Sequence, residues 1–175
     1  KAFLKRKNIE ISARRYGIDA LGAMAQGLFA SLLIGTIIST IGEQAGIEIL
    51  IQIGGYAKDA TGAAMAVAIG YALKCPPLVL FSLIAVGGAS NALGGAGGPL
   101  AVLVIGIIAS EFGKAVSKET KLDIIVTPSV TIIIGVLLSM WITDMAVVAM
   151  LMPLAKAVCD EEGVKPLESN FGKGL

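Results

Sequence analysis

The sequence predicts an all-α, polytopic integral membrane protein, and three features of its composition support this prediction. Hydrophobic residues make up 55% of the 175 residues and charged residues only 15%, whereas soluble domains carry roughly a quarter charged residues. The mean hydropathy is +0.83. Glycine is abundant at 22 residues, while aromatic residues make up only 5%, a balance typical of closely packed membrane helices. We expect about five or six hydrophobic segments.

The composition also limits the chemistry that we expect. The chain contains no histidine, and its two cysteines, Cys75 and Cys159, lie in separate segments without CxxC spacing, so we expect reduced, structural thiols. No nucleotide-binding, zinc-binding or nucleophile-elbow motif occurs. The net charge of +1 favours no nucleic-acid partner. We therefore expect no enzymatic activity, no cofactor and no metal site, and we expect the lipid bilayer and a small-molecule solute as partners.

Residues 1–17 form a basic flank ahead of the first hydrophobic segment. Glu10 is the single acidic residue up to position 15. The basic residues of this stretch are Lys1, Lys5, Arg6, Lys7, Arg14 and Arg15. The flank predicts a cytoplasmic topology anchor that is attracted to anionic lipid. An arm that binds a partner or a nucleic acid is the alternative.

The first hydrophobic segment, Ile18–Ile41, is long enough to cross a bilayer as a helix. A turn is expected at 43–46. The next apolar run, Ile47–Ile53, is short and stops at Gly54 and Gly55. We interpret this run as half a helix or a re-entrant piece.

A helix rich in small residues is predicted over Ala60–Leu73, ended by Pro76 and Pro77. Small residues recur every four positions in it, as Gly62, Ala66 and Gly70 do. This spacing is used for close contact between membrane helices.

A glycine patch, Gly94–Gly98, separates two further apolar runs, Leu78–Leu93 and Leu100–Phe112. Consecutive glycines break a helix. Two structures fit the patch, an ordinary turn between two spans and a functional re-entrant loop whose backbone is satisfied by protein or a watery cavity.

The stretch Glu111–Asp123 is rich in charge and is expected to lie in water. Four crossings between the basic flank and this stretch would return the chain to its starting side. Both segments carry basic residues, so we place both in the cytoplasm. Two more apolar segments follow, Leu122–Leu138 and Met145–Val158, and then a polar tail.

Polar residues within or beside apolar spans are the candidates for a functional site, because a charge is costly there. The substrate-binding candidates are Asn91, Glu111, Thr143 and Asp144. Asp19 and Asp123 qualify by position too, but Asp19, Glu111 and Asp123 lie near predicted helix ends, which favours solvated carboxylates. Asp144 is flanked by apolar residues on both sides. The alternative for Asp144 is an N-cap of a helix that begins near Met145.

Several motifs in residues 1 to about 135 resemble the EIIC-like membrane proteins, relatives of the sugar-conducting subunit of the bacterial phosphotransferase system. They are Phe3-Leu4-Lys5-Arg6-Lys7, Tyr16-Gly17-Ile18-Asp19-Ala20-Leu21, Lys74-Cys75-Pro76-Pro77-Leu78-Val79-Leu80-Phe81, Glu111-Phe112-Gly113-Lys114 and Ser117–Pro128. The resemblance implies a multi-pass protein of the bacterial inner membrane, a homodimer, and transport of a sugar-type solute by a permease half. Some members of the family are regulators that do not transport, which is the alternative function.

The C-terminal part resembles a second family, the divalent-anion/sodium symporters, in Ser139–Leu154 and Glu168–Lys173. Thr143, Asp144 and Met145 stand where that family has its ligand-binding hairpin tip. This resemblance implies a fragment of a sodium-coupled dicarboxylate carrier as a further alternative. The expected division is therefore a basic flank at 1–17, EIIC-like helices at 18–135 and a symporter-like segment with a polar tail at 136–175, in a fusion, chimera or fragment.

Overall fold

The computed structural model describes residues 3, 6–9, 12–118 and 122–161, without the side chains of residues 96 and 143–161. The described residues form helices and contain no strand, which confirms the all-α prediction. In chain order the elements are η1 (Arg15–Asp19), α2 (Ala20–Leu28), η2 (Phe29–Leu33), α3 (Ile34–Ala45), α4 (Glu48–Asp59), α5 (Thr61–Ala72), α6 (Pro77–Gly94), η3 (Gly95–Gly97), α7 (Gly98–Val116) and α8 (Asp123–Glu161).

The first four elements form one continuous helix, Arg15–Ala45, of 31 residues, which is about 46 Å long at the usual helical rise. It ends at Gly46, whose φ of 68° is left-handed and favours glycine. Two of its turns, η1 and η2, are π-helical. Its hydroxyl side chains bond back to the helix, as Ser31 does to the Gly27 carbonyl at 2.8 Å.

Helices α4 and α5 return alongside this long helix. The short helical piece expected at 47–53 was predicted to stop at Gly54 and Gly55. This predicted end is wrong, because α4 continues through both glycines. Gly54 is buried against α3, where a Cβ would lie 2.5 Å from the Gly35 carbonyl oxygen, so here glycine allows helix contact. The break comes instead at Ala60, between α4 and α5.

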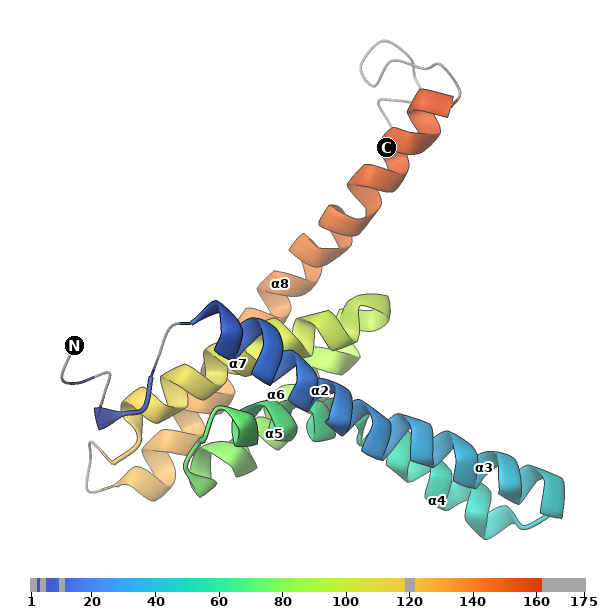
Figure 1. Ribbon diagram of the computed structural model, residues 1–175, viewed down its shortest axis with the longest axis horizontal. Helices are drawn as coiled ribbons and strands as arrows, with labels where there is room; N and C mark the ends of the chain where they lie inside the picture. Colours follow the sequence, from blue (N-terminus) through green and yellow to red (C-terminus); the bar gives the residue numbers. More distant parts are fainter. Residues whose placement is uncertain (1–2, 4–5, 10–11, 119–121, 162–175) are drawn as a thin grey trace.

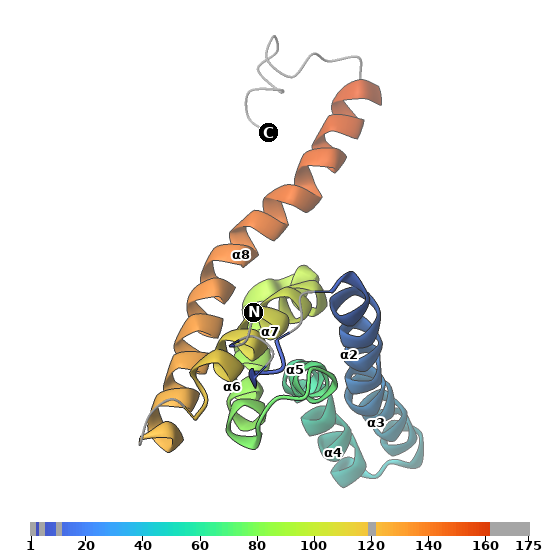
Figure 2. The ribbon, with the colours of Figure 1, turned by 60° about the vertical axis from the view of Figure 1, so that its left-hand side comes forward.

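Two regions result, shown in Figures 1 and 2. Helices α3 and α4 pack against each other as a hairpin that extends away from the rest, and we call this hairpin the arm. Helices α2, α5, α6, α7 and residues 123–142 of α8 pack together, and we call them the bundle.

The bundle core contains interlocking apolar side chains. Its largest members include Met65, Ile69, Leu73, Leu83, Val86 and Ile105. The small-residue pattern of α5 packs on α6 as predicted: a Cβ on Gly87 would lie 2.5 Å from the Ala66 Cβ and even closer to the Gly62 carbonyl oxygen. The α6 and α8 helices are also joined by a hydrogen bond of 2.8 Å between the Ser90 and Ser139 hydroxyls.

The glycine patch is a short 3-10 turn, η3, between helices of 18 and 19 residues that pack side by side. Gly95 has a φ of 49°, a conformation that glycine adopts without strain. The glycine patch therefore forms the ordinary turn between two spans and not the re-entrant loop.

Among the described residues, four helices are long and apolar enough to cross a membrane, namely Arg15–Ala45, Pro77–Gly94, Gly98–Val116 and Asp123–Ile142, and Thr61–Ala72 is a shorter apolar helix. The chain is a multi-pass membrane protein. Helix α8 continues without a break past residue 135 and through residue 144. The proposed N-cap role of Asp144 is therefore wrong, because no helix begins near Met145.

Candidate functional site at the basic end of the bundle

The N-terminal flank and the end of α7 meet at one end of the bundle, which we call the basic end. The ammonium of Lys7 donates to the Ser117 carbonyl, and that of Lys114 donates to the Asn8 carbonyl at 3.1 Å. The chain has therefore crossed the bundle an even number of times between these segments. The four crossings expected from the sequence would give an even number, but they stay a prediction, because only three described helices between these segments have span length, beside the shorter apolar helix Thr61–Ala72.

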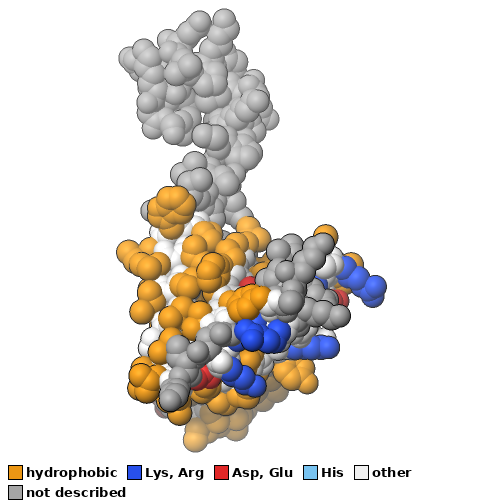
Figure 3. All heavy atoms as spheres, turned by 90° about the vertical axis from the view of Figure 1, so that its left-hand side faces the viewer, with side chains coloured by type: hydrophobic (Ala, Val, Ile, Leu, Met, Phe, Trp, Pro, Cys, Tyr) orange, Lys and Arg blue, Asp and Glu red, His pale blue; other side chains and the backbone are white. Residues whose placement is uncertain are grey.

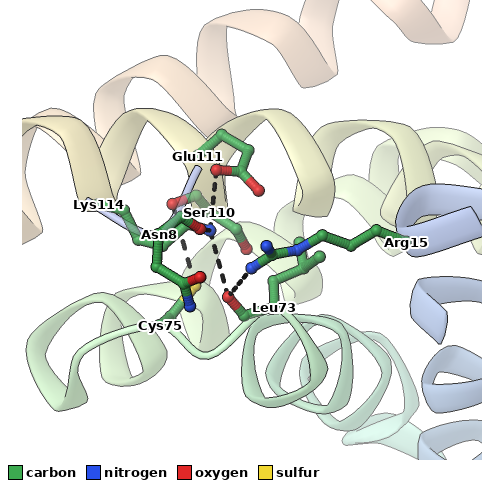
Figure 4. A network of polar contacts seen from close by, with 7 residues as sticks. All are labelled: Asn8, Arg15, Leu73, Cys75, Ser110, Glu111 and Lys114. Atoms are coloured by element: carbon green, nitrogen blue, oxygen red, sulfur yellow. Dashed lines mark hydrogen bonds and ion pairs between the residues drawn. The ribbon is translucent and has the colours of Figure 1, made fainter. Parts of the chain in front are cut away.

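Lys114 is buried at the centre of this end, with its side chain 2% exposed. Its ammonium lies 2.8 Å from Glu111 Oε2 and donates to the carbonyls of Asn8 and, at 3.2 Å, Leu73 (Figure 4). A lysine ammonium has three donors, so these three acceptors satisfy it fully. Lys114 thus joins α7, the end of α5 and the N-terminal flank.

The Leu73 carbonyl is available because α5 ends there. The Cys75 amide donates to the Gly70 carbonyl at 3.0 Å and the Lys74 amide to the Tyr71 carbonyl at 2.9 Å, which is the Schellman pattern of a helix C-terminus. Arg15 also donates to the Leu73 carbonyl, at 2.8 Å. Cations stabilise the partial negative charge at a helix C-terminus, so both basic residues fit this position.

Three further groups line the interior of this end. Glu111 Oε1 and the Ser110 hydroxyl are buried without a hydrogen-bond partner among the described residues. The Cys75 thiol lies 3.9 Å from the Ser110 carbonyl. Burial raises the pKa of Cys75 to about 11, so the thiol stays protonated at neutral pH and is a poor nucleophile.

The expectation that Glu111 is a solvated carboxylate is wrong, because its side chain is only 14% exposed and is paired with Lys114. The stretch expected in water is also shorter than predicted, since α7 continues to Val116 and Ser117 is buried. Asp123 is half-buried at the start of α8, and its carboxylate accepts the Lys118 amide at 2.7 Å and the Thr127 hydroxyl.

The structure does not bring the substrate-binding candidates together. Asn91 is half-buried beside Gly62 and Gly98, at the glycine-turn end of the bundle. Glu111 lies thirteen residues further along α7 than Gly98, which is about 20 Å of helix. The side chains of Thr143 and Asp144 lie outside the described residues.

Sequence reasoning missed an open cleft of about 340 Å³ at the basic end. Its lining includes Asn8, Ser12, Arg14, Arg15, Asp19 and Lys74. These residues come from the N-terminal flank, the start of the first helix and the end of α5, so their proximity depends on the fold. The cluster of basic residues was the available signal, but by itself it indicated only topology.

Figure 3 shows this end of the molecule from outside. Lys and Arg side chains gather on one part of this face, whereas the neighbouring surface is largely hydrophobic. Charged and apolar surfaces thus adjoin, as they do where a membrane protein leaves the hydrocarbon and enters the headgroup region.

The sequence matches the family model described as phosphotransferase system, EIIC, over residues 18–170. The match continues across the boundary expected at 135, and the resemblance of the C-terminal part to sodium symporters finds no support in the comparisons. A search of curated protein sequences and a search of solved structures found no match to this chain. The family match covers most of the chain, and the chain therefore belongs to the EIIC family of the phosphotransferase system.

Proposed function

We propose that this chain forms one wall of the passage through which an EIIC-type permease moves a sugar across the membrane. The observation that carries the proposal is the family match over residues 18–170, which gives the chain a sugar-transport-related role. The four helices of span length fit this role.

The packing of the bundle supports a wall instead of a complete channel. Its core is filled by apolar side chains such as Met65, Ile69 and Val86, which offer no partners to the hydroxyl groups of a sugar. A sugar would therefore move along a face of this bundle.

We place the sugar-contacting residues at the glycine-turn end. Asn91 is half-buried there, and its amide can both donate to and accept from sugar hydroxyls. Thr143 and Asp144 follow Ser139, the partner of Ser90, by about one turn of α8. Glu111 is left out because its carboxylate is engaged with Lys114.

Transport of this kind needs no covalent chemistry from the chain itself, and we propose that the chain is not an enzyme. The buried, protonated Cys75 thiol is consistent with this.

We further propose that the basic end faces the cytoplasm of a bacterium and that the protein is a homo-oligomer. The basic end carries Lys7, Arg14, Arg15, Lys74 and Lys118, whereas the turn at 94–99 carries no charged residue, as the positive-inside rule requires. Large apolar side chains exposed on the arm, such as Ile37 and Ile49, offer surface for a second copy. Single cysteines at 118 and 95 test the orientation: a membrane-impermeant maleimide added to intact cells should label only position 95.

Counterflow in vesicles tests the transport proposal. Vesicles that contain the protein are loaded with one unlabelled sugar, and entry of the same labelled sugar is followed for a panel of hexoses, hexitols and disaccharides. We expect saturable entry for at least one sugar. Asn91→Ala should raise the half-saturating concentration, whereas Gln52→Ala, which removes an exposed amide on the arm, should not.

Two results would contradict the transport proposal. Saturable sugar binding without any flux would favour the regulator that does not transport. Neither binding nor flux for any sugar, with the protein inserted and helical, would remove the sugar passage altogether.

A further inference from the structure

We propose that the cleft at the basic end binds a phosphate group, carried either by an anionic lipid headgroup or by a soluble phosphate ester. This proposal goes beyond the sugar passage, whose contacts we place at the opposite end of the bundle. The cleft volume of about 340 Å³ is within the range of small-molecule sites, roughly 300–1,000 Å³.

The charges that line the cleft favour an anion. The cleft is lined by three cationic side chains, those of Arg14, Arg15 and Lys74, and by one carboxylate, that of Asp19. Neither Arg14 nor Lys74 has a hydrogen bond or ion pair with a described residue, so their charges are available to a ligand. Basic pockets of this kind at the ends of membrane helices bind phosphate-bearing headgroups.

The backbone holds one of these cations in an unusual position. Lys74 follows the end of α5 with a φ of 57°, where helices usually carry glycine because a side chain is strained there. The chain nevertheless has a lysine at this point, and its side chain lines the cleft. Asn8, which also lines the cleft, has a φ of 53°.

The other cleft residues suggest what accompanies the phosphate. Arg15 points to the Leu73 carbonyl, to which it donates (Figure 4), and this contact fixes its guanidinium beside the cleft. Asn8 and Ser12 offer neutral donors. Asp19 would repel a phosphate but can accept hydrogen bonds from hydroxyl groups, so the cleft fits a phosphate that carries hydroxyls, as in a phosphoglycerol headgroup or a sugar phosphate.

The position of the cleft fits both sources. Arg15 begins the first membrane-spanning helix, and Tyr71, 77% exposed, lies close to the cleft in sequence. Tyrosine at the surface of a membrane helix marks the headgroup level. A lipid phosphate would reach the cleft from the bilayer, and a soluble ester would reach it from water.

The test measures binding to the full chain in phosphatidylcholine nanodiscs. One experiment adds phosphatidylglycerol to the nanodisc. The other adds inorganic phosphate, glycerol phosphate or a hexose phosphate to the buffer. The variants are Arg14→Gln, Lys74→Gln and the two combined. Lys118→Gln is the matched control, because Lys118 is also an exposed lysine with a φ of 60° at the same end but does not line the cleft.

We expect saturable binding in at least one of the two experiments, and the experiment that shows it identifies the source of the phosphate. Each lost cation should weaken binding roughly fivefold, the equivalent of one charge near an anionic surface, and the double variant on the order of twentyfold. Lys118→Gln should bind like the natural chain.

The absence of binding in both experiments would overturn the proposal. Equal weakening by Lys118→Gln and Lys74→Gln would do so too, because it would show attraction to a diffuse basic surface and no site. Circular dichroism checks that each variant is folded. Because Arg14 is exposed and helical, its single substitution keeps the test decisive if a change at Lys74 disturbs the end of α5.

Discussion

The bundle and the arm are both helix assemblies within one chain, yet they are held together differently. The bundle buries large apolar side chains from several helices, such as Leu83, Val86 and Ile105. The arm buries almost only small residues where its two helices meet, namely Gly35, Ser39 and Gly42 on α3 and Gly54 on α4.

The apolar side chains of the arm point outward instead. Those exposed include Ile34, Ile37, Ile41, Ile47, Ile49, Ile51 and Ile53. In lipid there is no hydrophobic gain from burying such side chains against each other, and close backbone contact through small residues takes over. The two regions should therefore respond to different substitutions, and region-resolved hydrogen exchange can follow each of them.

The largest effect is expected at the basic end of the bundle. Lys114→Met leaves the buried Glu111 carboxylate without its partner, and breaking a buried pair in this way costs about 3–5 kcal/mol. Exchange should rise in 111–118 and at the end of α5, while the arm stays protected. Lys118→Met, at an exposed position, should change little.

A partial rescue sharpens this prediction. Glu111→Leu added to Lys114→Met removes the unpaired charge and should recover part of the lost stability. If Lys114→Met exposes the arm as much as the bundle, the two regions are one cooperative unit and the comparison fails.

The next effect distinguishes two adjacent glycines of the arm. A Cβ on Gly54 would lie 2.7 Å from the Ser39 amide nitrogen, whereas one on Gly55 has no atom within 4 Å. Gly54→Ala should destabilise the α3–α4 contact by about 2 kcal/mol, as overpacking does. Gly55→Ala should instead stabilise α4 by roughly 0.5–1 kcal/mol.

Exchange of 34–59 measures both changes, and the bundle should remain protected in each variant. Equal behaviour of the two alanine variants would show that the arm does not depend on close contact at Gly54.

A smaller effect is expected for hydroxyl groups in the bundle. Ser90→Ala removes the bond to Ser139, and such bonds between membrane helices contribute about 0.6 kcal/mol on average. Ser82→Ala is the matched control, because among the described residues the Ser82 hydroxyl bonds only to the Leu78 carbonyl of its own helix. Thermal unfolding in detergent compares the two, and a larger loss for Ser82→Ala would contradict the assignment.

The smallest effect concerns the reactivity of Cys75 and not stability at neutral pH. With a pKa of about 11, roughly one thiol in a thousand is ionised at pH 8. In a Cys159→Ser background, alkylation should be slow at pH 8 and should rise about tenfold per pH unit toward pH 11. Because burial favours the neutral thiol in the folded state, stability should fall as the pH rises from about 9 to 11. Fast alkylation at pH 8 in the folded protein would show that the thiol is exposed.

The sequence predicted the helical class and the packing face of α5, because residues spaced by four give a visible pattern. It did not predict that Gly54 and Gly55 continue a helix: glycine ends helices in water but permits close contact in membranes, and the choice depends on what faces it. Glu111 and Lys114 are charged residues next to a predicted helix end, so they were expected in water. Their burial depends on carbonyls from Asn8 and Leu73, which are distant in sequence.

The two π-helical turns of the first helix have a consequence for its rotational phase. Gly27, Ser31, Gly35 and Ser39 are buried at intervals of four, and in an ideal α-helix such a series drifts by about 40° per step. The π-helical turn at Phe29–Leu33 contains one residue more than an α-helical turn and offsets part of this drift. The row of buried small residues therefore keeps facing α4 and α5. That turn can therefore absorb the loss of one residue by becoming an ordinary α-helical turn, and the arm would keep roughly its direction. Loss of one residue from the α-helical part between this turn and the arm would instead rotate the arm by about 100° relative to the bundle.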